Sequence, residues 1–176
     1  MKQQILVTGP VKTRSGYGNH ARDICRALID LDKYDVIINS VRWGNTPMNA
    51  LEDGNEHHEK IKSRILTSPQ LAKQPDLHIH VVVPNEFTPV AKKNIGVTAG
   101  IETTIPVPQW LEGMNRMDMN IVTSEFTKAG FSNANFDFEN EETKQKGNIK
   151  VTKPMEVLFE GVDTDEYFET KDMDEY

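Results

Sequence analysis

The stretch GIETTIPVPQWLEGMNRMDMNIVTSEF, residues 100–126, holds the strand-to-helix transitions that decide the fold. Two prolines near its middle stand where proline is tolerated, in the first turn of a helix, and predict a helix over 107–116. The apolar run 119–123 predicts a buried strand. Ser124 then fits the N-cap of a following helix, which we expect to last about two turns and to end near Gly130.

The same alternation of strand and helix extends in both directions from this stretch. Short apolar runs bounded by turn residues predict further strands over 5–8, 34–39, 77–83, 94–99 and 155–159. Apolar residues at helical spacing predict helices over 18–31 and 57–66. Nearly continuous apolar strands that alternate with helices are typical of parallel sheets covered on both faces. The sequence therefore predicts an α/β fold, a Rossmann-like and mostly parallel sheet of about six strands with helices on both faces.

Length and composition favour one domain. The chain has 176 residues, of which 37% are hydrophobic, enough for one sizeable core. We assign residues 1–168 to this domain and expect a polar insertion, a solvated loop or hairpin, near 132–153. The acidic residues 169–176 are expected to form a tail or the start of an interdomain linker.

Charge and cysteine content narrow the classes of partner and compartment. The formal net charge of −7 argues against a nucleic-acid-binding surface, which needs clustered Lys and Arg. Cys25 is the single cysteine, so an intrachain disulfide is impossible and a reducing cytoplasm is the expected setting. No apolar run approaches the length of a transmembrane segment, and the first residues do not fit a signal peptide.

A Gly-rich turn, Gly16-Tyr17-Gly18-Asn19-His20-Ala21, formally fits the dinucleotide fingerprint G-x-G-x-x-A. Two features argue against NAD: seven residues separate the turn from the first strand, and no acidic residue closes the second strand. The turn can still bind a ligand without being a dinucleotide fingerprint. Its glycines allow close approach of a ligand to the backbone, and the amides of a helix N-terminus favour negative charge. The alternative is a tight turn before a helix.

Polar residues in the third strand and at its carboxyl end are further candidates. His78 and His80 point to the same face, as in a metal site, but no third ligand follows at a fixed spacing. Packing beneath a helix is the alternative for both, and His80, nearer the strand end, is a candidate ligand contact. Asn85 and Glu86 follow the strand and suit the hydroxyl groups of a sugar, or they form a simple loop.

Five segments in this order resemble the N-terminal half of a GT-B-type glycosyltransferase of the retaining glycosyltransferase group 1, related to glycogen and sucrose synthases. They extend from Ser15 to Phe168 and include the Gly-rich turn, the segment Glu102-Thr103-Thr104 with a proline and Trp110 after it, the segment Ser124-Glu125-Phe126 with Lys128, and the turn Glu160-Gly161-Val162-Asp163. Trp110 fits either the core or a sugar platform, with its helical neighbours favouring the core.

The resemblance implies where a substrate site lies. Ser15, Gly16, Tyr17, Gly18 and His20 would line the interdomain cleft, near the donor phosphates and the acceptor. The other implied cleft residues are Glu102, Thr103, Ser124, Glu160 and Gly161. We expect Gly161 to supply a turn conformation that other residues adopt only under strain, and Tyr167 and Phe168 to pack onto the domain. No residue is assigned a catalytic role, and no metal is implied.

The resemblance also implies what is missing. Most contacts to the nucleotide sugar come from a C-terminal domain, so this half is expected to bind no cofactor alone. A UDP-, GDP- or ADP-sugar would be the donor of the complete enzyme, and a sugar or glycan the acceptor. The partner is then a C-terminal Rossmann domain or a separate subunit. Two alternatives remain: a non-catalytic module that pairs with another subunit, and a different Rossmann-like enzyme such as an epimerase or dehydrogenase.

Overall fold

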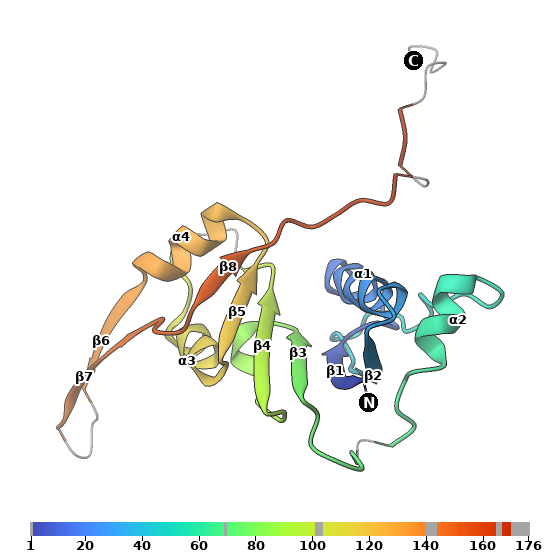
Figure 1. Cartoon of the computed structure of the whole chain (residues 1–176). Coiled ribbons are helices and arrows are strands. Elements are labelled where there is room, and N and C mark those ends of the chain that lie inside the picture. The colour runs from blue at the N-terminus through green and yellow to red at the C-terminus, as the bar shows by residue number, and fades with distance from the viewer. Residues whose placement is uncertain (1, 69, 101–103, 140–143, 165–166, 170–176) are drawn as a thin grey trace.

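A computed structural model describes residues 2–68, 70–100, 104–139, 144–164 and 167–169. Its centre is a six-stranded sheet in the order β2-β1-β3-β4-β5-β8, in which every neighbouring pair is parallel (Figure 1). The strands are β1 (Gln3–Gly9), β2 (Tyr34–Ser40), β3 (Leu77–Val81), β4 (Lys93–Thr98), β5 (Met119–Val122) and β8 (Met155–Val157). The expected Rossmann-like α/β fold is confirmed.

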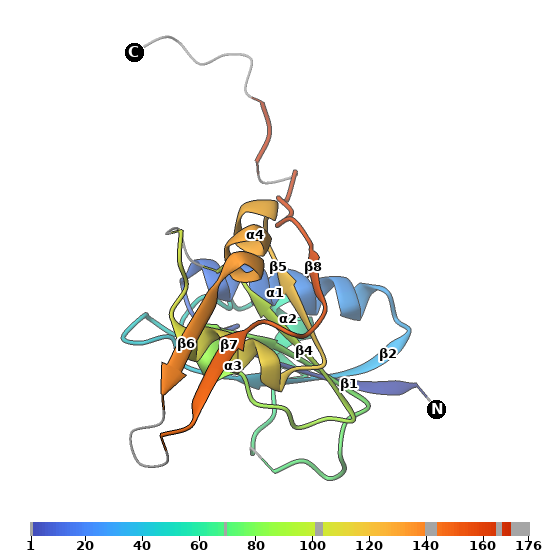
Figure 2. The same ribbon diagram turned by 90° about the vertical axis from the view of Figure 1, so that its left-hand side faces the viewer.

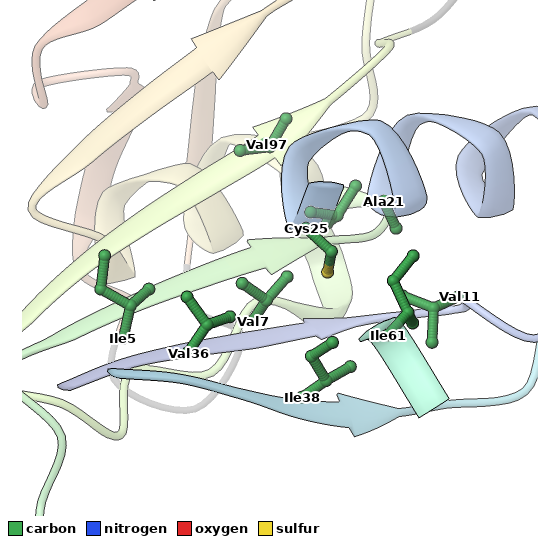
Figure 3. Packing of buried hydrophobic residues seen from close by; sticks show 10 residues of the cluster. Ile5, Val7, Val11, Ala21, Cys25, Val36, Ile38, Ile61 and Val97 are labelled. Atoms are coloured by element: carbon green, nitrogen blue, oxygen red, sulfur yellow. The ribbon is translucent and has the colours of Figure 1, made fainter. Parts of the chain in front are cut away.

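Helices cover both faces because the strands carry apolar side chains on both. On one face, α1 (Gly16–Asp30) and α2 (Glu56–Lys62) pack over a core that includes Val7, Ala21 and Cys25 (Figure 3). On the other face, the 3-10 turn η1 (Pro84–Glu86), α3 (Pro108–Arg116) and α4 (Glu125–Asn133) enclose a second core. The buried members of that core are Val82, Phe87, Leu111, Met114, Met117, Val122, Phe131, Ala134 and Met155.

Two helices end at different places from those expected. The helix after Ser124 continues past Gly130 to Asn133, because the fully buried ring of Phe131 anchors its last turn in the second core. The helix predicted over 57–66 ends at Lys62. The chain then runs beside β2, where Ile65 bridges Ile38 and the backbone amide of Leu66 donates to the Ile38 carbonyl. Strand pairing thus takes the residues that periodicity assigned to the helix.

The polar segment 132–153 forms a hairpin. Strands β6 (Asn135–Glu139) and β7 (Lys146–Lys150) pair antiparallel, and Figures 1 and 2 show the hairpin beside α3. Phe136 and Ile149 pack against the second core, so the segment contributes more to the core than its composition predicted. Within the described residues, no helix is long and apolar enough to cross a membrane.

Candidate functional site

A pocket of about 780 Å³ lies between α1, α2 and the chain that follows β8. From α1 and its cap it is lined by Ser15, Gly16 and His20, and from the chain after β8 by Glu160 and Gly161. The carboxyl end of β8 lies at the far side of the sheet from β1. The chain after β8 therefore returns along the carboxyl edge of the sheet toward α1, as Figure 1 shows.

The Gly-rich turn has two glycines with different roles. Ser15 caps α1, its Oγ accepting a hydrogen bond of 3.0 Å from the amide of Gly18. A Cβ at Gly18 would stand 2.3 Å from the Thr13 carbonyl oxygen, so Gly18 is required for the packing of the turn itself. A Cβ at Gly16 would meet nothing within 4 Å. Of these two glycines, Gly16 alone lines the pocket, and its lack of a side chain keeps that part of the wall open.

Tyr17 points away from this pocket, toward the carboxyl edge of the sheet. Its ring stacks on Trp43, with centroids 4.3 Å apart, and its hydroxyl accepts a hydrogen bond from the Ala99 amide just after β4. Burial raises the pKa of Tyr17 above its ordinary value of 10.0. Tyr17 thus fixes the first turn of α1 to two loops at the carboxyl edge. Trp43, in the loop after β2, was not singled out from the sequence.

His20 and Glu160 join the two ends of the site. Their Nδ1 and Oε1 atoms are 3.0 Å apart, the imidazole is 8% exposed, and the carboxylate is 52% exposed. Gly161 follows directly, but it does not hold a positive φ, and a Cβ there would meet nothing within 4 Å. The expectation that Gly161 supplies a strained turn is wrong. A residue with a side chain can therefore stand here without a strained φ.

Arginines along α1 also line the pocket, and no local sequence pattern indicates their partners. Arg26 donates to Asp163 over 2.6 Å, an ion pair between residues 137 positions apart. Arg22 donates over 2.9 Å to the carbonyl oxygens of Val11 and Thr13, which braces the loop before α1. Burial lowers the pKa of Arg22. Asn19, Asn55, His57 and His58 also line the pocket.

His78 and His80 lie on the opposite face of the sheet, outside the pocket. His78 Nε2 and Thr8 Oγ1 share a hydrogen bond of 2.9 Å, and His80 Nδ1 accepts one of 3.2 Å from the Thr88 amide. Burial lowers their pKa values to about 3 and about 4, respectively. Both rings are therefore neutral packing groups. The described residues contain no group of three His, Cys, Asp or Glu side chains that could hold a metal ion.

The remaining candidates are dispersed along the carboxyl edge. Asn85 and Glu86 are exposed in η1 after β3, and neither lines the pocket. Ser124 Oγ accepts a hydrogen bond of 3.1 Å from the Thr127 amide, which confirms it as the cap of α4. Glu102 and Thr103 lie outside the described residues.

The aromatic residues singled out in the sequence differ in burial. Trp110 stacks on Phe131 in the second core, with ring centroids 6.2 Å apart, as its helical neighbours predicted. Tyr167 and Phe168 are 69% and 68% exposed, so the expectation that they pack onto the domain is wrong.

The pocket is suited to a polar ligand. Its wall combines guanidinium donors with carboxylates and amides, which offer both halves of the hydrogen bonds that hydroxyl groups make. Comparison with protein-family models, with curated proteins and with solved structures finds no match for this chain. The parallel six-stranded sheet with helices on both faces places the chain in the class of Rossmann-like α/β proteins.

Proposed function

We propose that this chain is the acceptor-side half of a sugar-nucleotide-dependent glycosyltransferase, which transfers a glycosyl group to a sugar or glycan acceptor. The observation that carries the proposal is the meeting of two motifs from opposite ends of the chain. Gly16 and Gly161, 145 residues apart, line one pocket, and His20 and Glu160, which also line it, are in contact at 3.0 Å. The resemblance to the group 1 glycosyltransferases predicts both motifs at one cleft.

The chemistry asked of this half is binding and orientation. Retaining transfer of this type is driven by positioning and by electrostatic stabilisation of an oxocarbenium-like transition state. The donor nucleotide would be held by a second Rossmann domain or a partner subunit. The isolated chain is therefore expected to bind a glycan weakly and to catalyse almost no transfer from UDP-, GDP- or ADP-sugars.

Saturation-transfer NMR with a panel of neutral sugars and oligosaccharides tests this proposal. We expect a saturation-transfer signal from at least one glycan. This signal should be lost in Gly16→Val, where the new side chain projects into open space at the pocket wall. Gly130→Val is the matched control, because Gly130 also lies in a helix with nothing within 4 Å of its Cβ position and is not part of the pocket.

Each other outcome has a definite meaning. Glycan signals that survive in Gly16→Val contradict the assignment of the site. Tight binding of NAD or of a nucleotide by the chain alone would favour an epimerase- or dehydrogenase-like enzyme instead. An absence of glycan binding across the panel overturns the proposal.

A second candidate, a non-catalytic module that pairs with another subunit, is favoured by the apolar residues after β8. Phe159, Val162 and Tyr167 are 69%, 64% and 69% exposed, which is unusual for large side chains with no partner. Sedimentation of the purified chain with and without a candidate subunit separates this function from transfer, because a module of this kind forms a stable complex and shows no glycan signals.

A further inference from the structure

The segment after β8, residues 158–164, is attached to the domain almost entirely through polar contacts. We call it the C-terminal strap. The amide of Leu158 donates to the Val122 carbonyl, which extends the β5–β8 pairing by one bond. The large apolar side chains of the strap, those of Leu158, Phe159 and Val162, are 54% to 69% exposed. No buried large apolar side chain of the strap therefore holds residues 158–164 against the domain.

One histidine–carboxylate contact and one ion pair fix the strap along α1. Glu160 meets His20 at 3.0 Å, and Asp163 meets Arg26 at 2.6 Å. The contacts have matching spacings. Six helical residues rise about 9 Å, and three residues of extended chain cover about 10 Å. An extended strap running in the same direction as α1 thus satisfies both contacts at once, which sets its register.

The strap is also a wall of the pocket. Glu160, Gly161, Val162 and Asp163 all line the cavity, opposite the α2 residues His57 and Ile61. Movement of the strap away from α1 removes that wall and frees Arg26 and His20 toward the cavity. The groups that hold the strap closed are therefore the groups that a ligand would meet when it is open.

We propose that the C-terminal strap is a latch that closes the pocket, held by Arg26–Asp163 as the principal positioning pair and by His20–Glu160. Charges near a surface are screened by salt, and a segment with few buried apolar contacts opens locally at small cost. The strap therefore exchanges between a latched and a released form, and ionic strength shifts the balance toward release.

A single spin label measures the latch directly. Val162→Cys places a thiol on the exposed part of the strap, and the native Cys25 is fully buried with a pKa raised to about 12, so a nitroxide reagent attaches at position 162. In the latched form the nitroxide broadens the amide signals of His57 and Ile61 across the pocket. Release lowers that broadening.

In the labelled protein, Arg26→Gln is expected to lower the broadening of the α2 signals by roughly threefold or more. A rise in KCl from about 0.05 M to about 0.5 M is expected to lower it to a similar extent. Lys60→Gln is the matched control, since Lys60 pairs with Glu56 and Asp30 and not with the strap. Asp163→Asn should match Arg26→Gln, and the double variant should lose no more than either single one, because the pair is broken once.

Equal broadening in the original protein and in Arg26→Gln would overturn the latch, as would equal effects of Arg26→Gln and Lys60→Gln. Additive losses in the double variant would show that the two residues act through different partners, and would overturn their assignment as the pair that holds the latch. Because no ligand is present in this experiment, its failure is distinct from failure of the glycosyltransferase proposal.

Discussion

Tyr17 and Thr98, 81 residues apart, share a hydrogen bond of 2.8 Å between their hydroxyl groups. This bond joins the first turn of α1 to the last residue of β4 at the carboxyl edge of the sheet. The helix that begins with the Gly-rich turn is therefore held in two ways: its first turn is bonded to loops at the carboxyl edge of the sheet, and its apolar face packs on the core. Tyr17 is a structural tie close to the pocket.

Tyr17→Phe is expected to lower the free energy of unfolding by about 1–2 kcal/mol, because it leaves the Ala99 amide without its partner and removes one of the two hydrogen bonds of the Thr98 hydroxyl. The stacking on Trp43 remains. Urea denaturation checks this value. Tyr34→Phe is the control, since the partly buried Tyr34 makes no hydroxyl hydrogen bond to any residue that the structure describes. Equal losses in the two variants would contradict the role of the tie.

The two glycines of the Gly-rich turn should respond oppositely to alanine. Gly18→Ala brings a methyl group to 2.3 Å from the Thr13 carbonyl and is expected to cost about 2–3 kcal/mol in unfolding free energy. Gly16→Ala has open space and should change stability by less than about 1 kcal/mol. Thermal unfolding of the two variants side by side measures the difference. Comparable melting temperatures would show that the turn relaxes around Gly18.

The buried histidines predict loss of stability in acid. His78 and His80 have folded pKa values of about 3 and about 4, below the ordinary 6.5, so the unfolded chain takes up protons that the folded chain does not. Stability is full above about pH 6.5 and falls as the pH drops toward these values. At pH 5 the expected loss is about 2 kcal/mol for each ring.

Urea titrations at about pH 7.5 and about pH 5 measure this loss. His78→Asn removes one of the two rings, so the difference between the two pH values should fall by about half, whatever the variant does to stability at neutral pH. An unchanged difference in that variant would rule out His78 as a source of the acid sensitivity.

Cys25 should be unreactive in the folded protein. Its thiol is fully buried against the first core, and burial raises its pKa to about 12, which leaves on the order of a thousandfold less thiolate at pH 8 than an ordinary cysteine has. Labelling with a chromogenic disulfide should be negligible without denaturant and complete in urea. Fast labelling of the folded chain would mean that α1 opens readily from the sheet.

Most of the architecture follows from local sequence. Strands with apolar side chains on both faces, such as the one that contains Val7, cannot remain in water on either side, so a covered parallel sheet is the expected outcome. Ser124 and Ser15 cap helices because a hydroxyl can satisfy an amide that lacks a partner in the first turn. These effects act within a few residues, where a sequence pattern can be read directly.

Several predictions failed because the outcome depends on where distant residues lie in the fold. Nothing near Ile65 in the chain indicates that it pairs with β2, and nothing near Tyr167 indicates that its ring stays exposed. Residues of the site were missed for the same reason. Arg26 and Trp43 are ordinary surface-helix and loop residues until the fold brings Asp163 and Tyr17 to them.

The sequence alone determined the α/β class, the approximate elements and the presence of a Gly-rich turn before a helix, because hydrophobic periodicity, capping and turn chemistry are local properties. The tertiary structure decided which residues share the pocket. The chain after β8 returns along the carboxyl edge of the sheet, and this return brings Glu160 to His20 and Asp163 to Arg26. These residues are 137 or more positions apart, so the strand order of the whole sheet determines whether they meet.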